Sequence, residues 1–150
     1  MSLGVAEMSS INRGTVSAGL DLRLVGPDGV MVPLRADLHY SSQDPYAVGM
    51  SLDTGMDEPV KWFLGRDLLA AGLHGREGIG EVRAWPSVAS ATGEKTLTIV
   101  LGPPGGCARF EVGAAVIEAF LARTFELVPG GQETDCLDLD AELAELLSQA

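Results

Sequence analysis

The side chains best suited to chemistry in this 150-residue chain gather in residues 59–86. Both tryptophans, Trp62 and Trp85, lie in this stretch, with the charged neighbours Arg66 and Asp67 between them. Large aromatic and arginine side chains dominate binding energies at protein interfaces. Catalysis by a nucleophile needs a base beside it, and no such pair falls in this stretch. The residue types therefore predict binding or packing rather than a reaction.

The residues with the strongest metal and redox chemistry are dispersed along the chain. His39 and His74 each lie in a region without a second histidine or a cysteine, and Cys107 and Cys136 belong to no paired motif. A zinc site or a disulfide framework needs more thiols or closer histidines. We therefore expect no metal site, and two reduced cysteines of the kind found in cytosolic proteins.

The glycine-rich segments lack the order of elements that phosphate-binding loops require. Residues 75–80 lead from a predicted helix into a strand, whereas a dinucleotide fingerprint leads from a strand into a helix. Residues 102–106 are not followed by the Lys-Ser/Thr of a phosphate loop, and the chain has no Gly-x-Ser-x-Gly elbow. These patterns predict a protein that is not an enzyme and binds no cofactor. A small-ligand barrel or an unrecognised enzyme is the weaker alternative.

The charge of the chain is strongly negative and uneven. The net charge is −11, and residues 126–150 hold seven acids and no lysine or arginine. Nucleic-acid phosphates and anionic membrane surfaces both select for basic residues, so neither is an expected partner. The longest apolar runs are far shorter than a membrane span, and no signal segment is evident. A cytoplasmic protein is therefore expected.

Apolar and polar residues alternate along much of the first half of the chain, which is typical of half-buried strands. The predicted strands there are residues 15–24, 30–40, 46–53 and 60–64. The short turns between them favour antiparallel neighbours. Three further strands are predicted, with Pro86 ending the first of them: residues 79–85, 95–101 and 107–112.

Three helices complete the predicted order. The first spans residues 66–71, with Asp67 at the positive end of the helix dipole and Gly72 in the left-handed conformation that stops it. Residues 112–125 are apolar nearly all round, which predicts a helix buried on most sides. An acidic helix beginning at Asp138 has one apolar face. That face consists of Leu139, Leu143, Leu146 and Leu147.

These elements predict a flexible arm at residues 1–14 and one α+β domain at residues 15–150. The order is four strands, a helix, three strands and two C-terminal helices. The sheet is expected to be antiparallel and seven-stranded, with the helices covering part of it.

Several candidate residues allow two interpretations. Trp62 and Trp85 are either partner hot spots or fillers of the core or of a subunit interface, and the second is favoured. Alternation is poor around Trp62, so both faces of its strand are expected to be covered. Arg66 and Asp67 either dock a partner or cap the helix and form a local salt bridge. The leucine face of the last helix is expected to be buried either against its own domain or against a neighbouring subunit.

Three motifs of the chain resemble the SsgA-like sporulation and cell-division proteins of actinobacteria, most of all their SsgB type. They are Asp44-Pro-Tyr-Ala-Val48, Trp62-Phe-Leu-Gly-Arg-Asp-Leu-Leu-Ala-Ala-Gly-Leu73 and Val82-Arg-Ala-Trp-Pro-Ser87. The combination is specific, and the resemblance runs from about Thr15 to the C-terminus. Gly65, the turn at residues 103–106 and residues 1–14 depart from the family pattern, which leaves the subgroup open.

The resemblance implies a barrel-like sheet wrapped by helices, similar to whirly-type single-stranded nucleic-acid-binding folds, and a homotrimer. It also implies a cytoplasmic protein at the division septum. Such a protein helps to recruit or position the tubulin-like division protein FtsZ, together with an SsgA-type partner. A single-stranded nucleic-acid-binding module is the alternative, but the net charge of −11 argues against it.

Overall fold

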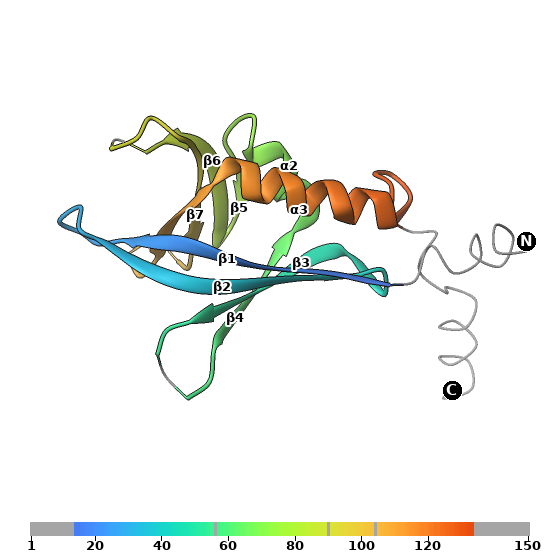
Figure 1. Cartoon of the computed structure of the whole chain (residues 1–150), viewed down its shortest axis with the longest axis horizontal. Helices are drawn as coiled ribbons and strands as arrows, with labels where there is room; N and C mark the ends of the chain where they lie inside the picture. Colours follow the sequence, from blue (N-terminus) through green and yellow to red (C-terminus); the bar gives the residue numbers. More distant parts are fainter. Residues whose placement is uncertain (1–13, 56, 90, 104, 134–150) are drawn as a thin grey trace, which may run out of the picture.

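The computed structural model describes residues 14–133, apart from residues 56, 90 and 104. Within them, eight strands form one antiparallel sheet and two helices pack against it (Figure 1). The first half of the chain forms β1 (Thr15–Val25), β2 (Met31–Ser41), β3 (Asp44–Asp53), β4 (Val60–Gly65) and α2 (Arg66–Gly72). The second half forms β5 (Glu77–Ile79), β6 (Val82–Val88), β7 (Lys95–Leu101), β8 (Ala108–Gly113) and α3 (Ala114–Leu127).

The strands lie in the order β4-β3-β2-β1-β8-β7-β6-β5. Two four-stranded halves, each built from consecutive strands, are therefore joined where β1 pairs with β8. The sheet curls into a half-barrel, with β4 and β5 at its edges (Figure 1). This arrangement confirms the predicted α+β class and its antiparallel sheet.

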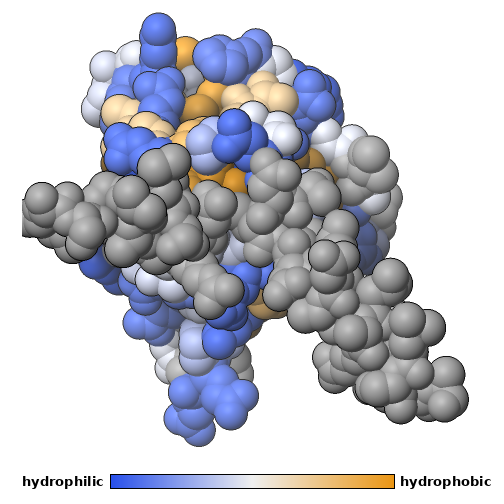
Figure 2. All heavy atoms as spheres, turned by 90° about the vertical axis from the view of Figure 1, so that its right-hand side faces the viewer, coloured by the Kyte–Doolittle hydropathy of each residue, from blue (hydrophilic) through white to orange (hydrophobic). Residues whose placement is uncertain are grey.

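The core lies between the inner face of the curled sheet and the two helices. α3 contributes Ile117, Phe120 and Leu121, and α2 contributes Leu69, which is fully buried. Alternate residues of β1 and β2 meet them from the sheet, as the predicted alternation requires. Figure 2 shows one end of the molecule, where hydrophobic residues are visible in the upper part of the view with hydrophilic residues above and beside them.

The predicted count of seven strands does not match the eight observed. The additional strand is β5, of which only Ile79 falls in the predicted strand at residues 79–85. Most of that predicted strand is β6, which begins at Val82 and forms a hairpin with β5. Gly80 turns the chain with a φ of +67°, a conformation that favours glycine. β6 also continues through Pro86 to Val88, beyond the reach of β5. A proline is tolerated there because the strand has no hydrogen-bonded neighbour on that side among the described residues.

The predicted role of Gly72 is wrong, although the predicted end of the helix is nearly right. Gly72 does not have a positive φ, and the capping residue Leu73 has a right-handed helical conformation. A Cβ atom on Gly72 would lie 2.8 Å from the Cβ atom of Ala84 on β6. Glycine is therefore needed for close packing of α2 on the sheet and not for backbone freedom.

Two smaller expectations also change. The long helix begins at Ala114 instead of Val112, because Val112 belongs to β8 and is paired with both β1 and β7. The strand around Trp62 is not covered on both faces, because Phe63 is 68% exposed while Leu64 is buried. β4 is an edge strand with one buried face.

The ends of the chain lie outside the described residues. They include nearly all of the predicted arm and the last predicted helix, with Leu139, Leu143 and Leu146. Gly14 is described, and its backbone N–H donates a hydrogen bond to the Ser42 hydroxyl. In the described part of the chain, no helix is long and apolar enough to span a membrane.

Candidate interaction site

Trp85 lies on the outer face of the sheet, opposite the helices. Its neighbour in the register on β7 is Thr98, which is paired in turn with Glu111 of β8. Ala84 directly precedes Trp85 on β6 and faces the other way, and it is fully buried in the core. The alternation of β6 therefore directs Trp85 away from the core, so the expectation that it fills the core does not fit this position, whereas a place in a subunit interface stays a prediction.

Three arginines surround Trp85 on this face. The guanidinium carbon of Arg76 lies 4.6 Å from the centre of the Trp85 ring, and that of Arg109 lies 5.4 Å from it. Arg83 lies two positions before Trp85 in the sequence and on the same face of β6. We call Arg76, Arg83, Trp85 and Arg109 the arginine–tryptophan patch.

The register of the strands brings these residues together. Val100 of β7 is paired with Arg83 on one side and with Arg109 on the other, and it is buried beneath them. Gly78 of β5 is paired with Arg83, and a Cβ atom on Gly78 would lie 2.6 Å from the Cα atom of Arg83. Glycine at position 78 thus lets the edge strand β5 pack closely against β6. Arg76 lies just before β5 in the sequence.

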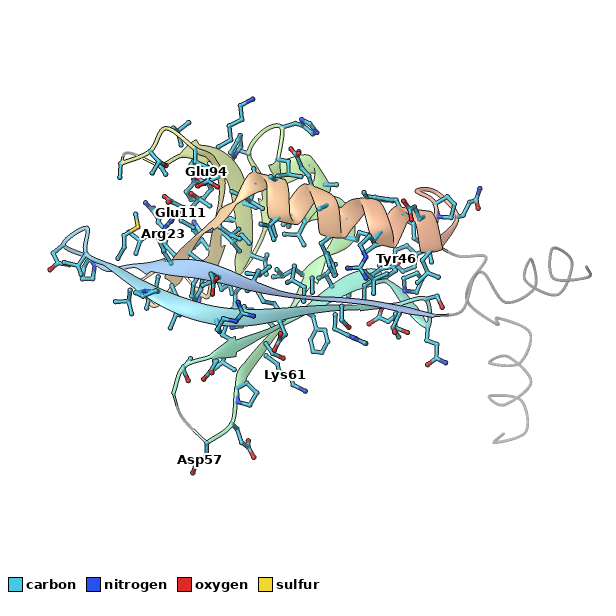
Figure 3. All side chains as sticks on the ribbon, in the orientation of Figure 1. Arg23, Tyr46, Asp57, Lys61, Glu94 and Glu111 are labelled. Carbon is cyan, nitrogen blue, oxygen red and sulfur yellow. The ribbon has the colours of Figure 1, made fainter. Side chains whose placement is uncertain are left out.

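The patch has cations without anionic partners. Among the residues that the structure describes, no ion pair involves Arg76, Arg83 or Arg109. Their neighbour Arg23 differs, because its Nη2 atom lies 2.6 Å from Glu111 Oε1 on the adjoining strand (Figure 3). Guanidinium groups held by an aromatic ring present several donors to a carboxylate or phosphate. The patch can therefore bind an anionic group.

Trp62 lies in a different environment, on the inner side of β4. It is partly buried against the core and lines an apolar hollow of about 360 Å³ at the end of the half-barrel. The wall of this hollow is almost entirely apolar and includes Leu24, Leu34, Leu52, Trp62, Leu101 and Phe110. Trp62 and Trp85 are therefore not parts of one site, although they are close in the sequence.

Arg66 is buried, with 1% of its surface exposed. Its Nη1 atom donates hydrogen bonds to the carbonyls of Thr124 (3.1 Å) and Val128 (2.6 Å) at the end of α3. Its Nη2 atom lies 3.1 Å from Glu133 Oε2. The guanidinium also lies over the ring of Phe125 at 4.1 Å. Through these contacts Arg66 links the start of α2 to the end of α3 and to Glu133.

The pKa of the Glu133 carboxyl is lowered in the folded protein. A hydrogen bond from its own backbone lowers the pKa of the Glu133 carboxyl most, and the nearby Arg66 guanidinium lowers it further. Burial acts in the opposite direction but is outweighed. The carboxylate is therefore held in its charged form beside the buried arginine.

The candidate residues from the sequence thus lie in several separate places in the structure. Asp67 is exposed in the first turn of α2, as expected for a carboxylate at the positive end of a helix. Arg66 faces the interior and pairs with Glu133, which neither of its two sequence interpretations included. Leu139, Leu143 and Leu146 lie outside the described residues.

Sequence reasoning missed Arg76, Arg83 and Arg109 as a group. The available signal was the shared parity of Arg83 and Trp85 on one strand, but Arg109 joins them only through the register of β6, β7 and β8. Within the described ranges, no group of histidine, cysteine, aspartate or glutamate side chains is arranged to hold a metal ion.

Comparison with known proteins gives consistent matches. The family described as Streptomyces sporulation and cell division protein, SsgA, matches residues 34–133. Sporulation-specific cell division protein SsgB of Thermobifida fusca (strain YX) is 46% identical over 134 residues, which cover 89% of this chain and 96% of that protein. SsgB of Streptomyces coelicolor is 44% identical over 136 residues, with coverages of 91% and 98%.

A solved structure agrees with the sequence matches. The crystal structure of an SsgA-like sporulation-specific cell division protein from Thermobifida fusca matches with a TM-score of 0.79 at 44% identity. The match covers 89% of this chain and 96% of that one. Similarity therefore extends over the sheet and helices as a whole.

Proposed function

The chain belongs to the SsgA family of sporulation and cell division proteins, and from this we propose that it acts in sporulation-specific septation as a non-enzymatic adaptor. The observation that carries the proposal is the 46% identity to an SsgB protein over nearly the full length of both chains. The name of that relative assigns it to sporulation-specific cell division. An adaptor needs surfaces for binding rather than a reaction centre.

The finer proposal is that this adaptor helps to recruit or position the FtsZ ring at septum sites in the cytoplasm, with an SsgA-type partner. Two surfaces on different faces of the sheet support such a role: the apolar hollow at Trp62 and the arginine–tryptophan patch at Trp85. Separate surfaces permit one partner to be held while another is bound. A homo-oligomer, with a trimer favoured, is part of the same proposal.

Co-sedimentation with FtsZ tests the proposal. The full chain is mixed with polymerised FtsZ, with and without an SsgA-type partner, and the pelleted fraction is measured. We expect the chain to pellet only when FtsZ polymers are present. Unpolymerised FtsZ is the control. A chain that stays in the supernatant in every mixture contradicts direct FtsZ recruitment.

The nucleic-acid-binding alternative is not favoured. Single-stranded nucleic acids are bound by basic grooves in which aromatic rings stack on the bases. Here two guanidinium groups already lie over the ring of Trp85, and the chain has a net charge of −11. The similarity to whirly-type folds stays a prediction.

A further inference from the structure

The arginine–tryptophan patch concentrates positive charge on a chain that has little of it. Arg76 and Arg109 are exposed, and Arg83 is partly buried with its Nε atom lacking a hydrogen-bond partner in the described part of the chain. Glu77 of β5 is paired with Ala84, whose side chain faces the core, so it does not neutralise the outer face. The patch is therefore open to an external anion.

The geometry of the patch favours carboxylates on a peptide. Two guanidinium groups lie over the ring of Trp85, so the ring helps to orient their donors, and a stacking base would compete with them for the ring. Three arginines in one place also form a compact site, whereas a nucleic acid needs an extended basic groove. Arginine forks pair well with the carboxylates of aspartate and glutamate.

The chain itself contains a segment of this chemistry. Residues 134–150 hold five acids and no lysine or arginine. They follow Glu133, which the buried Arg66 holds on the helix side of the sheet. We propose that the arginine–tryptophan patch of one copy binds residues 134–150 of a second copy. This proposal concerns self-association and does not depend on a role in septation.

The position of Glu133 favours a second copy over the same chain. Glu133 lies beyond the end of α3, and α3 itself is about 20 Å long over its 14 residues. The patch lies on the opposite face of the sheet, beside the residues of β8 that precede the start of α3, with Arg83 level with Arg109 and Trp85 level with Glu111. Residues 134–150 would have to run back along the molecule and around a sheet edge to reach the patch of their own chain. A patch-to-segment contact between copies is head-to-tail, which closes into a ring or continues into a chain.

The two native cysteines provide a direct test. Cys107 is exposed two positions before Arg109, and Cys136 lies in the acidic segment. The full chain is treated with bis-maleimidoethane, a short thiol-to-thiol cross-linker, and is run on a denaturing gel. We expect dimers and higher species, and none of them in Cys107→Ser or in Cys136→Ser.

Variants that remove positive charge test whether the cross-link depends on the arginine–tryptophan patch. Arg76→Gln with Arg109→Gln is expected to lower the cross-linked yield about tenfold, because two charged contacts are lost. The matched control Lys61→Gln, on the outer face of β4 and also without an ion pair among the described residues, should leave the yield unchanged (Figure 3). Circular dichroism confirms that each variant is folded.

Three outcomes would overturn the proposal. Cross-linking only within single chains would place the segment on its own copy. Dimers that persist in Cys136→Ser would join two patches instead of a patch and a segment. An unchanged yield in the double arginine variant would remove the patch from the contact.

Discussion

Two clusters in this molecule place arginine over aromatic rings, and they differ in what else the arginine contacts. Arg66 lies over Tyr40 and Phe125, is buried, and also contacts two carbonyl groups and the Glu133 carboxylate. Arg76 and Arg109 lie over Trp85 at similar distances, but both are exposed and form no ion pair within the described residues.

The comparison shows that a cation over a ring is not by itself a structural or a binding feature. A buried guanidinium has to be compensated by acceptors from the same molecule, because an uncompensated buried charge is very costly. An exposed guanidinium is compensated by water and remains available to another anion. The acceptors therefore distinguish the Arg66 cluster, which holds the fold together, from the arginine–tryptophan patch.

The largest expected effect comes from removing Arg66. Arg66→Leu leaves the Glu133 carboxylate buried without its cation, and we expect a loss of about 3–5 kcal/mol in the free energy of unfolding. Urea denaturation measures this loss. Adding Glu133→Gln to Arg66→Leu should recover part of it, because the orphaned charge is removed. A loss equal to that of the exposed control Arg123→Leu would contradict a structural role for the cluster.

The helix that carries Arg66 is expected to be sensitive at its other end. Gly72→Ala places a methyl group 2.8 Å from the Cβ atom of Ala84, so α2 has to move away from β6. We expect a loss of about 1–3 kcal/mol in the free energy of unfolding. Gly75→Ala is the control, because a Cβ atom there meets nothing within 4 Å and φ is not positive. Equal melting temperatures for the two variants would contradict the close packing.

Acid should weaken the Arg66 cluster. The pKa of Glu133 is lowered from its usual value of 4.5 in the folded state, so its contribution to stability is present above that value. The contribution is lost as the pH falls through the lower pKa of the folded state. Urea denaturation midpoints measured across the acid range should therefore fall less steeply in Glu133→Gln than in the wild type. Glu126→Gln, which changes an exposed acid of α3, should keep the slope of the wild type.

Local patterns predicted much of the fold. Alternation located β1, β2 and β3 to within a few residues, because half-buried strands repeat every second residue. The hairpin at Gly80 was missed because its first strand has only three residues, too few for a period to show. The role of Gly72 was misjudged because a close approach to Ala84 depends on tertiary packing.

The candidate site was harder to predict for a related reason. Its members come from three parts of the chain and share a face only through the pairing of β5, β6, β7 and β8. Arg66 and Glu133 are likewise distant in the sequence, so nothing local distinguished the buried Arg66 from the exposed arginines. Long-range register and burial carry this information, and both depend on the whole fold.

The most direct test of the comparison is the urea midpoint of the double variant Arg76→Gln with Arg109→Gln. If the patch is a binding surface, its arginines contribute little to folding, and the free energy of unfolding should change by no more than about 2 kcal/mol for the two exposed contacts. Arg66→Leu serves as the reference for a structural arginine. A loss in the double variant as large as that of Arg66→Leu would show that the patch is a structural cluster and not a binding surface.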